Sequence, residues 1–198
     1  MKHFIINIGC EYGSGGPDIG RMISESLGIP FYDRDLVDQV VEKLGVDRDL
    51  VEKADSGEEN VKYEFDTTFG PRYANLTNRV IYTQFEVIHK LAAKSSCVII
   101  GRCSNYILKD RDDCLNIFVY APDEFKVKHI MEQKGISEKE AKKLVKYNDG
   151  MLKSRYEYMT NSDMRDCRTR HMMIDSSILG LEKTAKYIMQ LIDLRFED

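Results

Sequence analysis

The stretch EYGSGGPDIGR, residues 11–21, has the residue types that hold phosphate. It follows the apolar run FIINI and places three glycines directly before a helix-forming segment. Glycines let backbone N–H groups point into one concave turn, and the start of the next helix adds partial positive charge. The residues expected to hold the phosphates of a nucleotide are Tyr12, Gly13, Ser14, Gly15 and Gly16.

This stretch departs from the P-loop pattern G-x-x-x-x-G-K-[S/T] at three of its four defining positions. With Gly15 as the second glycine, Cys10 stands where the first glycine belongs. Gly16 replaces the lysine, and Pro17 replaces the hydroxyl residue that binds magnesium. Two other interpretations stay open. One is a dinucleotide fingerprint, although Asp18 breaks the G-x-G-x-x-G spacing, and the other is a tight turn without a ligand.

Charged residues follow two further apolar runs. Asp33 and Arg34 come after IPFY, and Arg102 comes after CVIIG. The carboxyl ends of parallel strands face the ligand crevice, and an arginine at a buried strand end needs an anion. We therefore expect all three residues to line an acceptor site, where Asp33 and Arg102 would also act in catalysis. The alternatives are a helix cap at Asp33 and an internal ion pair between Asp33 and Arg102.

Two later stretches carry further candidate ligands. In KYNDGMLKSRYEY, residues 146–158, Lys153 and Arg155 are candidate catalytic cations on a helical lid, and RDCRTR adds arginines at 165, 168 and 170. A lid would close on the transferring phosphates and exclude water, although a solvated charged face explains the same residues. In MIDSS, Asp175 and Ser176 would contact a base or ribose, or cap the final helix.

The elements that must position these residues alternate along the chain. Short apolar runs predict strands near 3–8, 29–33, 97–100, 115–122 and 171–175. Helical spacing predicts helices near 17–27, 36–45, 73–94, 125–135, 138–158 and 181–192. Strands that are apolar throughout and alternate with helices indicate an α/β fold with a parallel sheet covered on both faces. Residues 55–72 show no clear period, and we expect a surface loop there.

Composition limits the classes of partner. The net charge of −4 argues against nucleic acid, and no apolar stretch reaches the roughly 20 residues that cross a bilayer. Five cysteines without a C-x-x-C pair, and no secretory leader, indicate a reducing cytoplasm. The four histidines are scattered, so we expect no metal site formed by the protein alone. We expect a nucleotide or another small phosphorylated ligand as the partner, and the sequence does not indicate an oligomeric state.

In combination, these motifs resemble the cytidylate kinase-like family, near the bacterial CMP kinases among the P-loop nucleoside monophosphate kinases. The resemblance rests on EYGSGG, LGIPFYDRDLV, QFEVIHKLA, CVIIGRCSNYIL, FVYAPDEFKVKHI and IDSSILGLEKTA. It implies one domain with a five-stranded parallel sheet, a lid around 137–165 and an acceptor-side helical region around 33–95. It also implies phosphoryl transfer from ATP with magnesium to CMP, dCMP or a related acceptor. Asp33 would hold magnesium through water.

The chain departs from its relatives where they carry charge. Gly9-Cys10 stands in place of Ser-Arg, Pro17-Asp18 in place of Arg-Glu, and Met151-Leu152 in place of two basic residues. Phosphoryl transfer depends on placed cations, so another side chain must substitute if the protein is a kinase. The candidates are Arg21, Lys153, Arg155 and the cluster at 165–170. The alternative is a nucleotide-binding or regulatory protein that keeps the fold without catalysis.

Overall fold

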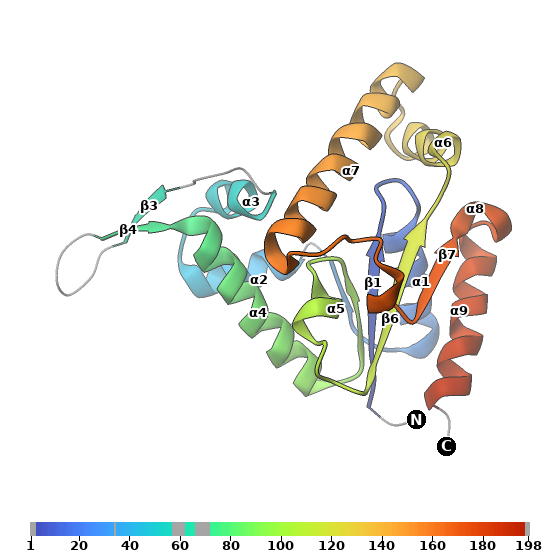
Figure 1. Cartoon of the computed structure of the whole chain (residues 1–198), viewed down its shortest axis with the longest axis horizontal. Coiled ribbons are helices and arrows are strands. Elements are labelled where there is room, and N and C mark those ends of the chain that lie inside the picture. The colour runs from blue at the N-terminus through green and yellow to red at the C-terminus, as the bar shows by residue number, and fades with distance from the viewer. Residues whose placement is uncertain (1–2, 34, 57–61, 66–71, 197–198) are drawn as a thin grey trace. The chain divides into compact units, whose positions relative to one another are not determined.

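The computed structural model describes residues 3–33, 35–56, 62–65 and 72–196 of the chain. The chain divides into two compact units, one formed by Met1–Asp33 with Ala92–Asp198 and the other by Arg34–Leu91. The elements of both units are labelled in Figure 1.

The first unit contains a five-stranded sheet in the order β2-β5-β1-β6-β7. Each neighbouring pair in this sheet is parallel. The strands are β1 (Ile5–Cys10), β2 (Phe31–Tyr32), β5 (Cys97–Ile100), β6 (Cys114–Tyr120) and β7 (Met172–Asp175). The predicted α/β fold with a parallel sheet is therefore confirmed.

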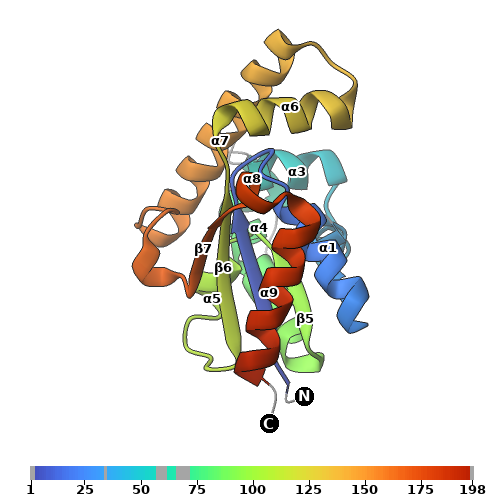
Figure 2. The ribbon, with the colours of Figure 1, turned by 90° about the vertical axis from the view of Figure 1, so that its right-hand side faces the viewer.

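Successive residues of the central strands face opposite sides of the sheet, which explains why these strands are apolar throughout. Ile8 of β1 and Ile117 of β6 belong to the main core with α1 (Gly16–Leu27) and α9 (Leu181–Phe196). These two helices pack side by side (Figure 2). Phe118 belongs instead to a second cluster on the other face, together with Cys103 and Tyr156 of α7 (Glu138–Thr160).

A hairpin of α6 (Asp123–Lys134) and α7 follows β6. Gly135 ends α6 in the left-handed conformation, and Ser137 begins α7 with a capping box that includes Glu140. Both signals are readable in the sequence, so the predicted boundaries of α7 differ from the observed ones by two residues at most. The helices pack through a small apolar cluster that includes Val127, Ile130, Ala141 and Val145.

The second unit corrects the expectation for residues 55–72. Where the structure describes this stretch, it contains the end of α3 (Arg48–Ser56) and the antiparallel pair β3 (Lys62–Phe65) and β4 (Arg72–Asn75). The rest of the expected loop, 57–61 and 66–71, lies outside the described residues. The alternation of charged and aromatic residues in KYEF is a short strand pattern that the neighbouring glycine and proline obscured. The unit also contains α2 (Asp35–Leu44) and most of α4 (Leu76–Lys94), which begins at 76 rather than 73 because β4 precedes it.

Three short helical segments in the first unit were not predicted: α5 (Ser104–Ile107), η1 (Cys167–Thr169) and α8 (Ser176–Leu179). Each has at most four residues, too few for a helical period to appear in the sequence. No helix in the described part of the chain is long and apolar enough to cross a bilayer.

Candidate functional site

The glycine loop, residues 11–16, joins β1 to α1 and requires glycine for two reasons. Gly13 and Gly15 have φ values of 84° and 81°, in the left-handed region that favours glycine. A Cβ at Gly13 would lie 2.9 Å from the carbonyl oxygen of Lys126, and one at Gly15 would lie 2.3 Å from Cδ2 of Leu181. The loop therefore packs tightly against both α6 and α9.

The loop offers its backbone rather than its side chains. Gly15 is the N-cap of α1, and no side chain caps that helix. The buried hydroxyl of Ser14 is turned inward, where Oγ donates to the carbonyl oxygens of Glu11 at 2.8 Å and Val119 at 3.1 Å. An uncapped helix start fits a phosphate. The loop does not fit magnesium in the P-loop manner, because Ser14 is engaged and Pro17 has no hydroxyl.

Cys10 fills the space beside Gly16. A Cβ built at Gly16 would lie 2.5 Å from Cβ and 2.7 Å from Sγ of Cys10. A lysine at position 16 would collide with the Cys10 side chain. The cysteine in place of the first P-loop glycine and the glycine in place of the lysine therefore depend on each other. Burial, together with nearby carboxylates, raises the pKa of the Cys10 thiol to about 12, so the thiol stays neutral. The carboxylates are those of Asp33, Asp149, Glu11 and Asp18.

The predicted acceptor residues lie at the ends of two strands. Asp33 follows β2, is half-buried, and is near enough to contribute to the raised pKa of Cys10. Arg102 follows β5 and is also half-buried. Arg34 lies outside the described residues. The structure thus brings Asp33 to the glycine loop, and the acceptor roles of all three stay predictions.

The turn after β5 has an unusual backbone. Gly101, Arg102 and Cys103 have φ values of 64°, 52° and 54°. Left-handed conformations cost roughly 1–2 kcal/mol for residues other than glycine, and such strain gathers at functional sites. This geometry holds the Arg102 side chain at the carboxyl end of the sheet, where a ligand crevice is expected.

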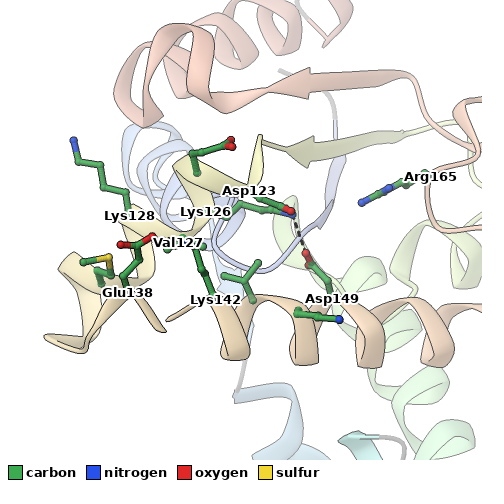
Figure 3. A pocket seen from close by; sticks show the side chains of 12 residues that line it. Asp123, Lys126, Val127, Lys128, Glu138, Lys142, Asp149 and Arg165 are labelled. Atoms are coloured by element: carbon green, nitrogen blue, oxygen red, sulfur yellow. Dashed lines mark hydrogen bonds and ion pairs between the residues drawn. The ribbon is translucent and has the colours of Figure 1, made fainter. Parts of the chain in front are cut away.

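A buried lysine beside the glycine loop was not predicted. Lys126 of α6 is only 3% exposed, and its Nζ lies 3.0 Å from Oε2 of Glu11 and 2.9 Å from Oδ2 of Asp149. Asp123 pairs with the same ammonium at 2.9 Å. In Figure 3, Lys126 and Asp149 point toward each other across the space between α6 and α7. The other oxygen of Asp149, Oδ1, accepts from the backbone N–H of Tyr12 at 2.7 Å.

Lys126 remains charged in this setting. Burial opposes the charge, but hydrogen bonds to the three carboxylates outweigh it and raise the pKa of Lys126 above its ordinary value. A sequence signal for this lysine exists. It lies one helical turn before Ile130 and next to Val127, on the apolar side of α6, where a lysine is expected only with a charged partner.

The lid cations are distributed unevenly around the loop. Arg165 pairs with Oε1 of Glu11 at 2.6 Å, so it contacts the glycine loop directly. Lys153 is 57% exposed and pairs with Glu157 on its own helix at 3.7 Å, while Arg155 is half-buried on α7. Lys153 and Arg165 line a small pocket of about 200 Å³ that also includes Glu11 and Asp149.

Asp175 and Ser176 hold the loop and a helix in place. The carboxylate of Asp175 accepts from the backbone N–H and the hydroxyl of Ser177, and so caps α8. Ser176 is fully buried, and its hydroxyl donates to the carbonyl oxygen of Ser14 at 2.6 Å. The Ser176 contact holds the glycine loop at Ser14, and the Asp175 contacts hold the start of α8. The proposed contact of either residue with a nucleotide stays a prediction.

The largest of the described pockets lies between α6 and α7, with a volume of about 680 Å³ (Figure 3). Its lining includes Lys126 and Asp149 but none of the loop glycines. Within the described residues, no group of three His, Cys, Asp or Glu side chains is arranged to hold a metal ion.

Comparison with protein families gives one match, over residues 5–178, to a model described as the cytidylate kinase-like family. No curated protein matches the chain. Among solved structures, the chain is similar to an uncharacterized protein from Eubacterium ventriosum ATCC 27560, with 27% identity and a TM-score of 0.72. That similarity covers 96% of this chain and 98% of the other.

Two shikimate kinases share the fold at lower identity. The enzyme from Acinetobacter baumannii, solved in complex with shikimate, is 16% identical with a TM-score of 0.55, covering 100% of this chain and 97% of that one. The enzyme from Bacteroides thetaiotaomicron is 13% identical with a TM-score of 0.57, covering 97% and 99%. The arrangement of strands and helices is therefore similar to that of these two enzymes.

Proposed function

The chain belongs to the cytidylate kinase-like family, and on that premise we propose that it is a phosphotransferase that moves a phosphoryl group from ATP to CMP, dCMP or a related small acceptor. The observation that carries the proposal is a helix start without a side-chain cap at the glycine loop, beside the charged, buried Lys126, which the Asp149 side chain links to the loop. ATP, when bound, would supply the phosphoryl group.

In this proposal the glycine loop binds the donor phosphates through backbone N–H groups at the start of α1. Lys126 takes the place of the P-loop lysine. Its ammonium is linked to the loop through Asp149, whose other oxygen accepts from the N–H of Tyr12. A phosphate could replace the Asp149 carboxylate, because the Lys126 ammonium and the Tyr12 N–H both bind an anionic oxygen in this structure. Charge-assisted contacts of this kind stabilise the charge that develops on a transferring phosphoryl group.

The acceptor would lie beyond the carboxyl ends of β2 and β5. Arg102 would bind the acceptor's anionic group through its planar guanidinium, aimed by the left-handed turn at 101–103. Asp33 lies on the same edge of the sheet and would orient the acceptor. Lys153, Arg155 and Arg165 would complete the positive surroundings from the lid, of which Arg165 already reaches the loop residue Glu11.

A second function is favoured by one specific observation. Asp149 already binds the N–H of Tyr12, and four carboxylates surround Cys10 at the loop. This negative surrounding opposes an incoming phosphate and fits a nucleotide-binding or regulatory protein without turnover. The two functions differ in one measurable respect, which is whether a bound nucleotide transfers its phosphoryl group.

The test is an assay of purified protein with ATP, magnesium and each common nucleoside monophosphate, with products separated by anion-exchange chromatography. We expect nucleoside diphosphate from CMP or dCMP. Lys126→Met should lower kcat by roughly 10- to 100-fold, since a charged hydrogen bond contributes about 1.5–3 kcal/mol. Lys128→Met is the matched control, because Lys128 lies on the same helix and is 77% exposed.

Lys126→Arg keeps the positive charge at this position. Comparing it with Lys126→Met therefore separates the effect of a lost charge on catalysis from an effect of substitution on folding. Calorimetric titration with ATP separates binding from turnover. Binding of ATP without any product would support the regulatory alternative, and absence of nucleotide binding in the folded wild-type protein would exclude both functions.

A further inference from the structure

Arg170 is a buried cation that forms no ion pair with a carboxylate among the described residues. Asp166 is near enough to act on its charge, but that carboxylate is paired with Arg168. It is 9% exposed, and its guanidinium lies between the rings of Phe118 and Tyr156, 5.4 and 5.3 Å from their centroids. One nitrogen, NH2, donates to the carbonyl oxygen of Met164 at 3.1 Å. Within the described part of the chain, Nε and NH1 are buried without a hydrogen-bond partner. A buried charge is costly unless it is paired, so this guanidinium indicates a missing anion.

The position of the guanidinium is built into the sheet. Gly9 of β1 leaves the space that it occupies, because a Cβ at Gly9 would lie 3.4 Å from NH2 of Arg170 and 3.2 Å from Cδ2 of Phe118. Together with the two aromatic rings, this fit holds Arg170 in one orientation. Arg170, two residues before β7, is thus fixed against the middle of the sheet.

Arg170 lines a pocket of about 420 Å³ whose lining has an unusual charge. Among its lining residues, all of them described, Lys109, Arg168 and Arg170 are cations and none is aspartate or glutamate. Arg168 also donates to Asp166, a neighbour outside the lining, from Nε at 2.9 Å and from NH2 at 2.8 Å. The pocket between α6 and α7 differs, since four acidic residues line it.

The other lining residues suit a flat ligand. Tyr106 and Tyr156 contribute rings, and amide and hydroxyl groups come from Asn105, Asn116, Ser162 and Thr169. Aromatic rings stack on planar groups, and a volume of this size accommodates a small organic molecule. His171 accepts from the backbone N–H of Asn116 through Nδ1 at 2.9 Å, which leaves Nε2 to donate.

This pocket is separate from the proposed phosphotransfer site. The far end of its lining, at Asn116, pairs in register with Asn7, four residues before Glu11 of the glycine loop, which corresponds to about 13 Å along a strand. The Arg170 guanidinium itself lies beside Gly9, two residues before Glu11. In Figure 2 the segment between α7 and β7 lies beside the middle of the sheet, and the glycine loop lies at the upper end of the sheet. Neither Asp33, Arg102 nor a loop glycine belongs to its lining.

We propose that this pocket, the Arg170 pocket, is a second ligand site that binds a small molecule with a flat ring and a phosphate or carboxylate group. Arg170 and Lys109 would bind the anionic group, and the tyrosine rings would contact the flat part. Tyr156 and Ser162 belong to α7 and the segment after it, so the ligand would bridge the lid helix and the segment that precedes β7.

The test is a two-dimensional ¹⁵N NMR titration that follows the Arg170 Nε–H signal and the backbone signals of residues 105–109 and 168–171. The probes are phenyl phosphate and benzoate, with inorganic phosphate and phenol as comparisons. We expect saturable shifts of these signals with phenyl phosphate, benzoate or both, which identifies the anionic group. Inorganic phosphate and phenol should each bind at least tenfold more weakly.

Variants distinguish this site from others. Lys109→Gln, at an exposed position, should weaken binding about two- to fivefold, and Arg170→Gln should weaken it at least tenfold. Lys128→Gln, in the pocket between α6 and α7, should leave the affinity unchanged. A thermal melt of each variant checks its folding, and Lys109→Gln keeps the test decisive if Arg170→Gln unfolds. Several results would overturn the proposal. The first is no shift at all, or shifts confined to residues 12–16. The others are binding of phenol or inorganic phosphate as tight as that of the probes, and an affinity that is unaltered in Lys109→Gln.

Discussion

Cys10 and Gly16 share one space at the start of α1. The cysteine side chain lies where a side chain at 16 would begin, so each residue constrains the other. Gly16 does not need glycine for its backbone, because its φ is outside the left-handed region, unlike those of Gly13 and Gly15. At this scale the absent lysine is a consequence of packing, and a charge at the loop has to come from a distant residue.

Gly16→Ala should therefore destabilise the protein by about 1–3 kcal/mol, the usual cost of overpacking. Cys10→Gly combined with Gly16→Ala should recover most of that loss, because the added methyl group then has room. Urea denaturation of the two single variants and the double variant measures this coupling.

Gly28→Ala serves as the control for the steric explanation. Gly28 has a φ of 63° and nothing within 4 Å of an added Cβ, so its substitution strains the backbone without crowding. Cys10→Gly should not rescue it. If the Cys10 and Gly16 changes prove additive instead, the shared-space explanation fails.

The Cys10 thiol should be unreactive at neutral pH. The thiolate is the nucleophile, and a pKa of about 12 leaves about one thiol in ten thousand ionised at pH 8. Because the pKa is raised, the reactive fraction should increase about tenfold for each pH unit up to that value. Mass spectrometry after iodoacetamide treatment can follow this, with the exposed Cys167 as the internal comparison. Equal labelling of the two cysteines at pH 8 would contradict the buried, acid-surrounded environment.

At the scale of elements, the hairpin of α6 and α7 is attached to the glycine loop by charge. Lys126 comes from α6, Asp149 from α7, and Glu11 and Tyr12 from the loop itself. The side chain of Tyr12 also packs against the apolar cluster of the hairpin. A movement of the hairpin would therefore alter the backbone donors of the loop, and under the proposed function this would link the position of the hairpin to phosphate binding.

The hairpin depends on a defined start of α7. Ser137→Ala should lower the free energy of unfolding by about 1 kcal/mol. The substitution removes Oγ of Ser137, which accepts from the N–H of Glu140, and so weakens the reciprocal bond from the N–H of Ser137 to the Glu140 carboxylate. Thermal unfolding followed by circular dichroism measures the change. Ser154→Ala, at an exposed position within the same helix, should be neutral or slightly stabilising. An equal loss in both variants would show that the cap has no special role.

At the scale of the whole molecule, the first unit has a complete core of its own. Every buried member of its main cluster lies within residues 4–23, 98–119 or 185–196. The second unit, Arg34–Leu91, is inserted between β2 and the end of α4. This organisation suggests that the sheet and the glycine loop do not need the inserted unit in order to fold.

Replacing residues 34–91 with a flexible linker of about ten residues tests this expectation. Such a linker can extend about 33 Å, well beyond the length of a four-residue strand such as β5. We expect a monodisperse protein with cooperative thermal unfolding and an α/β circular dichroism spectrum. A molten or aggregated product would show that the second unit is required for folding.

The sequence by itself determined the strands and long helices of the first unit and their architecture, but not its three short helical segments. Apolar runs, glycine stops and the capping box are local signals, and the alternation of strands with helices indicates a parallel sheet. The same local signals placed the glycine loop, Asp33 and Arg102 at strand ends. They were weaker in the second unit, where KYEF is too short for its alternation to outweigh the surrounding glycine and proline.

Only the tertiary structure decided which charges meet. Lys126, Glu11 and Asp149 are far apart in the sequence, and their contacts arise because the lid hairpin folds back onto the loop. The inward turn of Ser14 and the space shared by Cys10 and Gly16 arise in the same way. So does the buried guanidinium of Arg170, whose Nε and NH1 have no hydrogen-bond partner among the described residues. Sequence periodicity reports whether a position is buried, but the partner of a buried charge depends on distances between elements, which no local pattern contains.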